Sequence, residues 1–161
     1  MGVTTEADRL FDLGDEHSGE GARALQAGNV EEGHECFRQA ITAYQAAIKA
    51  VPEDDVVLRA NLSLCIGARE FGLGNLDIAS ERFEDALEWL RERPDLTSEG
   101  EGAEILTQAR LNRADHLVVT GSREEALVEV KAILADSPGH PYALHLFVQC
   151  GGTIEEEEQV E

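Results

Sequence analysis

The stretch Gly28–Ile41 (GNVEEGHECFRQAI) has two counterparts further along the chain, Gly74–Leu87 (GNLDIASERFEDAL) and Gly121–Leu134 (GSREEALVEVKAIL). Their first glycines are 46 and 47 residues apart. In each copy the glycine is followed by a small polar residue and then by a helical run. Glycine readily takes the left-handed conformation that ends a helix, and Asn or Ser is a good N-cap for the next one. Each copy therefore predicts a tight turn between two antiparallel helices.

The helical runs carry small and apolar side chains at a spacing of four and then three residues, as in Ala79, Phe83 and Ala86. This spacing places the side chains on one face of a helix. Extended along the chain, the pattern predicts helices over residues 5–27, 30–50, 54–73, 76–91, 101–120, 123–135 and 141–149. The first of these contains Gly14, Gly19 and Gly21, each of which costs a helix about 1 kcal/mol relative to alanine.

We therefore expect the first helix to break near residues 18–21, and residues 94–102 (PDLTSEGEG) to form an exposed loop. The predicted fold is all-α, an α-solenoid of about three antiparallel helical hairpins that share one core. A C-terminal capping helix closes it, with Leu144 and Phe147 pointing inward. Residues 1–152 are assigned to this helical repeat domain, and residues 153–161 to an acidic, disordered tail.

The second helices resemble those of the tetratricopeptide repeat family. In that family a small residue is followed by an aromatic residue four positions later, an alanine three later and a proline five beyond. Ala40, Tyr44, Ala47 and Pro52 have this spacing. The repeat period of 46–47 residues is longer than the family's value of about 34, and the usual Trp and Tyr of the first helix are missing. The alternative is a related solenoid of helical hairpins with longer helices.

The charge excludes several classes of function. The chain has 33 Asp and Glu against 13 Lys and Arg, a net charge of −20, so it lacks the basic clusters that bind nucleic acid or anionic membranes. The acidity has two interpretations: solvation in a salt-rich, halophilic cytoplasm, or attraction to a basic partner. The spread of the charge over the chain favours the first. Three cysteines without a CxxC motif, and no secretory signal in MGVTTEADRL, predict a cytoplasmic protein.

Motifs of catalysis and metal binding are absent from the sequence. There is no phosphate loop, GxSxG or HExxH, and the single Glu-x-x-His at residues 31–34 lacks the second copy that a di-iron site needs. We therefore expect no enzyme activity, no metal and no cofactor. Trp89 stands at the end of a helix face, three residues after Ala86. This position predicts core packing in preference to an exposed binding aromatic.

The resemblance implies a non-catalytic interaction module, a scaffold or adaptor whose first helices line a concave groove. A peptide or helix of a partner protein would bind there by apolar contact, with the side chains of Asn61 and Asn112 forming hydrogen bonds to its backbone. The open ends of a solenoid would also allow self-association. The alternative is an acidic chaperone or decoy for a basic partner, driven by charge. The expected partner-binding residues are Leu25, Asn61, Leu64, Ala68, Phe71, Gln108, Leu111, Asn112 and Asp115.

Overall fold

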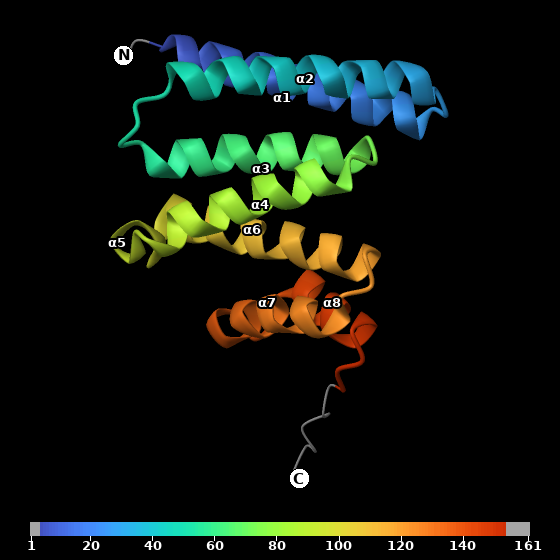
Figure 1. Ribbon diagram of the computed structural model, residues 1–161, viewed down its shortest axis with the longest axis vertical. Coiled ribbons are helices and arrows are strands. Elements are labelled where there is room, and N and C mark those ends of the chain that lie inside the picture. Colours follow the sequence, from blue (N-terminus) through green and yellow to red (C-terminus); the bar gives the residue numbers. More distant parts are fainter. Residues whose placement is uncertain (1–3, 154–161) are drawn as a thin grey trace. The chain divides into compact units, whose positions relative to one another are not determined.

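The computed structural model describes residues 4–153, and every regular element in this range is a helix (Figure 1). The all-α class is thus confirmed, with α1 packed against α2 and α3 against α4. The described residues form two compact units, unit 1 up to Ala109 and unit 2 from Arg110. The predicted acidic tail lies almost entirely outside the described residues. The helices are α1 (Glu6–Gln26), α2 (Val30–Ala50), α3 (Val56–Gly72), α4 (Leu76–Arg91), α5 (Pro94–Thr97), α6 (Gly100–Val119), α7 (Arg123–Asp136) and α8 (Pro141–Gln149).

The three repeated glycines form the tight turns that the sequence predicts. Gly28, Gly74 and Gly121 have φ angles of 85°, 82° and 86°, in the left-handed region. The amide after each glycine donates to a carbonyl five residues earlier, as in the bond of 2.9 Å from Asn29 to Ala24. This is the hydrogen bond that closes a Schellman turn. The polar residue after each glycine occupies the N-cap position, but its side chain makes no capping bond.

The first helix is continuous, so the predicted break near residues 18–21 is wrong. Its glycines are instead points of close approach between α1 and α2. A Cβ atom placed on Gly21 would lie 2.6 Å from Cδ1 of Phe37 and 3.0 Å from the carbonyl oxygen of Gly33, and Gly14 faces the ring of Tyr44 in the same way. The Tyr44 hydroxyl donates to Asp15 Oδ1 at 2.6 Å and lies 3.1 Å from Ser18 Oγ. Glycine lets the large side chains of α2 pack directly on the α1 backbone.

The second hairpin of unit 1 is built around the predicted stripe of α4. Ala79, Phe83 and Ala86 are all at most 2% exposed. They pack with residues of α3 and with Ile105 and Ala109 in the first half of α6. The predicted loop at residues 94–102 is partly wrong, because α5 forms one turn of helix there and α6 begins at Gly100. Proline stands at the first position of α5, where its fixed φ favours helix and its missing N–H costs nothing.

Unit 2 consists of the rest of α6 with α7 and the predicted capping helix α8. Its core joins Leu111, Ala114 and Leu117 of α6 to Ala126, Val130 and Ile133 of α7 and to Ala143 and Leu146 of α8. Ala143 and Leu146 are the buried residues of α8, whereas the expected Leu144 and Phe147 are only half-buried. The helix is therefore rotated by about one residue, 100°, from the orientation that the sequence predicts.

Candidate binding site

The residues expected to bind a partner lie in different environments. Leu64 and Leu111 are only 3% and 6% exposed and belong to the cores of unit 1 and unit 2. Their assignment as partner-binding residues is corrected, since their side chains pack between helices and offer no surface. The other seven are half-buried or exposed: Leu25, Asn61, Ala68, Phe71, Gln108, Asn112 and Asp115.

Two of these seven take part in contacts that hold the fold together. Phe71 packs against the core between α3 and α4. Asp115 accepts hydrogen bonds from the Tyr142 hydroxyl at 2.7 and 2.9 Å, which tie α8 to α6. Burial raises the pKa of the Asp115 carboxyl, and the bond from Tyr142 opposes this shift. Within α3, the Cys65 thiol lies 3.9 Å from the Asn61 side-chain oxygen.

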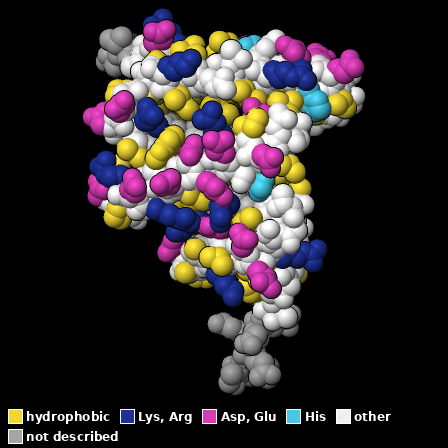
Figure 2. Space-filling model, in the orientation of Figure 1, with side chains coloured by type: hydrophobic (Ala, Val, Ile, Leu, Met, Phe, Trp, Pro, Cys, Tyr) yellow, Lys and Arg dark blue, Asp and Glu magenta, His cyan; other side chains and the backbone are white. Residues whose placement is uncertain are grey.

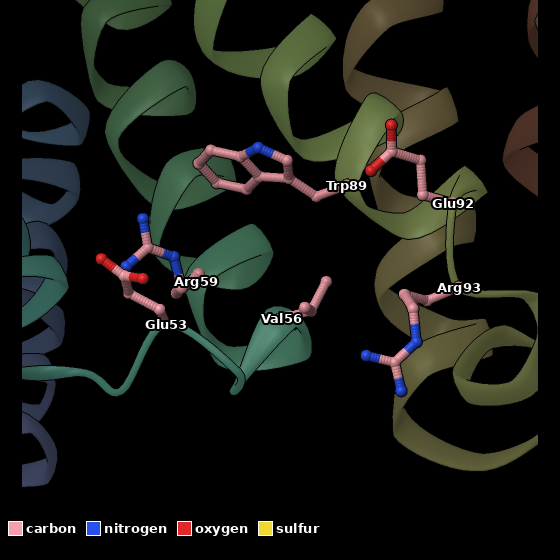
Figure 3. A pocket seen from close by; sticks show the side chains of 6 residues that line it. All are labelled: Glu53, Val56, Arg59, Trp89, Glu92 and Arg93. Atoms are coloured by element: carbon pink, nitrogen blue, oxygen red, sulfur yellow. The ribbon is translucent and has the colours of Figure 1, made fainter.

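A further candidate site surrounds Trp89, the only tryptophan of the sequence. The Trp89 side chain is half-buried: it packs on the core between α3 and α4 and also forms one wall of a pocket of about 310 Å³ (Figure 3). The predicted core packing therefore describes only part of its role. We call this site the Trp89 pocket, and its lining residues are Glu53, Val56, Arg59, Trp89, Glu92 and Arg93.

Three segments of unit 1 meet at the Trp89 pocket. The connection after α2 supplies Glu53, the first turn of α3 supplies Val56 and Arg59, and the end of α4 supplies Trp89. The start of α3 is fixed by Asp55, whose carboxylate accepts a hydrogen bond of 3.2 Å from the Leu58 amide. This cap sets where α3 begins and so determines the position of its first-turn side chains.

The two guanidinium groups of the pocket have different partners. Cζ of Arg59 lies 5.5 Å from the centroid of the Trp89 ring, a cation–π contact. Arg93 donates through Nε and Nη2 to the two carboxylate oxygens of Asp95, at 3.0 and 2.9 Å. These hydrogen bonds lower the pKa of Asp95. A second hollow shares Val56 and Arg93 with the pocket and is otherwise lined by Pro52, Asp54, Asp55, Val57 and Leu96.

No sequence motif marks this pocket directly. Trp89 is marked by being the single tryptophan and by standing at the end of a helix face. Its neighbours Glu53 and Arg59 are 36 and 30 residues away in the chain. They reach Trp89 only because α3 and α4 pack as a hairpin, and their exposure depends on how far each helix is rotated.

Among residues 4–153, no three or more His, Cys, Asp and Glu side chains gather as a metal site would require. Burial raises the pKa of the Cys65 thiol to about 11, so this thiol is protonated at neutral pH. Carboxylates on the face shown in Figure 2 are interspersed with basic and apolar side chains and do not form a single patch.

Comparison with known proteins finds no family model that matches the chain and no curated protein with significant similarity to it. No helix in the described range combines the length and apolarity that crossing a bilayer requires. Function is therefore inferred from the geometry of the Trp89 pocket and from the helical hairpins that carry it.

Proposed function

We propose that this chain is a non-catalytic protein–protein interaction module of tetratricopeptide-like hairpins, acting in the cytoplasm. It binds a peptide or helix of a partner protein at the Trp89 pocket of unit 1. The observation that carries the proposal is that the only tryptophan stands half-exposed in a pocket, in contact with Arg59. Trp and Arg are enriched among the residues that dominate binding energy at protein interfaces.

The size of the pocket supports a protein partner. A volume of about 310 Å³ is at the lower end of the range of small-molecule sites, roughly 300–1,000 Å³. It accommodates one or two inserted side chains, while the rest of a peptide would lie on the surrounding surface. The half-exposed α3 residues Asn61 and Ala68 remain candidates for that wider contact.

A capture experiment with matched variants tests the proposal. The tagged wild-type chain is used to isolate partners from its native host, and the same is done with Trp89→Leu and Leu13→Ala. Leucine at position 89 preserves apolar packing on the core but removes the aromatic wall. Leu13 is 42% exposed on α1 and lies outside the pocket, so it provides the control.

We expect the wild-type chain and Leu13→Ala to retain the same partner and Trp89→Leu to lose it, with circular dichroism showing that all three chains are folded. Equal capture by Trp89→Leu would overturn the proposal. Repeating the capture at molar salt separates this function from a purely charge-driven chaperone or decoy. A partner held by pocket contacts stays bound in part, whereas one held only by long-range charge is released.

A further inference from the structure

The walls of the Trp89 pocket and its adjoining hollow carry unbalanced charge. Four carboxylates line these two depressions, together with the guanidinium groups of Arg59 and Arg93. Arg93 is already neutralised by its two-bond pair with Asp95. This leaves one guanidinium against four carboxylates. The carboxylates belong to Glu53, Asp54, Asp55 and Glu92.

These local charges determine what can bind there. At physiological salt the Debye length is about 8 Å, so distant charges are largely screened and those lining the site dominate. In Figure 3, Glu53 and Glu92 lie on opposite sides of the pocket, with Trp89 and Val56 between them. A cationic head entering beside the ring therefore meets carboxylates from two directions, whereas an anionic one is repelled by both.

The tryptophan ring already accepts a cation from within the chain. The Arg59 guanidinium lies over it, with Cζ 5.5 Å from the ring centroid. The ring quadrupole attracts guanidinium and ammonium groups, most strongly for Trp. Val56 in the pocket, with Val57 and Leu96 in the adjoining hollow, offers half-buried apolar surface suited to the alkyl stem of a long basic side chain.

We infer that the partner segment bound at the Trp89 pocket is basic: an arginine or lysine side chain lays its stem on Val56 and Trp89 and directs its cationic head to Glu53 and Glu92. This inference rests on the proposed function and specifies the chemistry of the partner. The net charge of −20 adds to the effect by drawing a basic segment toward the chain and raising its rate of association.

Three synthetic peptides without tryptophan test the inference. They share length and apolar residues and differ only in carrying Arg and Lys, Gln, or Glu at the remaining positions. Because Trp89 is the only tryptophan of the chain, its fluorescence reports directly on the pocket. We expect the basic peptide to change the Trp89 emission and to bind most tightly by calorimetry. Its affinity should fall as salt is raised from about 0.1 M to about 1 M but stay measurable, because salt screens the charges and not the apolar contacts with Val56 and Trp89.

Charge-neutralising variants locate the binding. Glu53→Gln combined with Glu92→Gln should weaken the basic peptide by about tenfold or more. The control pair, Glu31→Gln with Asp77→Asn, removes the same charge from exposed positions of unit 1 outside the pocket and should have little effect. Arg59→Gln should strengthen binding, because it removes the cation that already occupies the ring.

Three results would overturn the inference: no binding of the basic peptide, equal binding of the Gln or Glu peptide, or equal weakening by the pocket pair and the control pair. None of these touches the proposed function, which fails if the partner captured from the host is retained by Trp89→Leu or is released completely by molar salt. The two failures are therefore distinguishable.

Discussion

Replacing Gly21 by alanine should destabilise the protein, although the same change two residues away should stabilise it. In a helix, glycine costs about 1 kcal/mol relative to alanine, so Gly→Ala normally raises stability. At Gly21, however, the new Cβ would lie 2.6 Å from Cδ1 of Phe37 and 3.0 Å from the backbone oxygen of Gly33. Phe37 is only 6% exposed, and its ring cannot retreat without disturbing the core of the hairpin.

Overpacking of this kind costs about 1–3 kcal/mol, which exceeds the gain in helix propensity over most of that range. We expect Gly21→Ala to lower the free energy of unfolding by up to about 2 kcal/mol, the overpacking cost less the gain in helix propensity. At Gly19 the nearest atom to a new Cβ is Nη1 at the far end of the exposed Arg23 side chain, at 3.5 Å. Gly19→Ala should therefore raise stability by up to about 1 kcal/mol.

Urea denaturation followed by circular dichroism measures both variants under identical conditions. The fitted slope also shows whether each variant keeps the cooperativity of the wild type. Equal stabilisation by Gly19→Ala and Gly21→Ala would refute the reasoning, because it would mean that α1 and α2 do not approach closely at Gly21.

Four further predictions concern packing and charge. Ala79→Leu should cost about 1–3 kcal/mol in the denaturation midpoint, because Ala79 is 0% exposed between packed helices; an unchanged midpoint would place it elsewhere. Glu129→Ala breaks the 2.8 Å ion pair with Arg113, in which the Glu129 side chain is only 4% exposed, and should lower the free energy of unfolding by about 1.5–3 kcal/mol. The control Glu35→Ala breaks an exposed ion pair with Arg38 and should change the free energy of unfolding little. Tyr142→Phe should raise the pKa of Asp115 further, because the lost hydrogen bond favoured the charged carboxylate; NMR of the carboxyl carbon measures this pKa. The pKa of Asp115 is already higher in the folded than in the unfolded chain. Protonation of Asp115 therefore contributes its full stabilisation below the unfolded-state pKa, and this stabilisation is lost as pH rises through the folded-state pKa. Finally, the excess of carboxylates should make the melting temperature rise with salt, and identical melting in dilute buffer and molar salt would contradict the view that repulsion among them weakens the fold.

The hairpin architecture was predictable because its determinants are local. A left-handed residue at Gly28, Gly74 and Gly121 is required by the turn itself, and the spacing of Ala79, Phe83 and Ala86 identifies one face of a helix without knowledge of its neighbour. Both features are found in the structure. They explain why the predicted helix limits are close to those observed.

The errors arise where a residue's role depends on a partner helix. A glycine inside a helix, such as Gly21, predicts a break when the helix is considered alone. Its contact with Phe37 becomes visible only when α1 and α2 are packed together. Leu64 and Leu111 lie on first helices, as expected, but the rotation of those helices directs them into the cores. The Trp89 pocket was missed for the same reason, since Arg59 and Glu53 reach it from the neighbouring helix and the connection before it.

The most direct test of the Trp89 pocket as a binding site is an NMR titration of the isotope-labelled chain with the partner captured by the wild-type protein. We expect the indole N–H signal of Trp89 to move first and furthest. The backbone amides of residues 53–59 and 89–93 should move with it, while those of α1 and α8 stay in place. Shifts that cluster on unit 2 or on α1 and α2, with the Trp89 indole unchanged, would contradict the account and place the binding surface elsewhere.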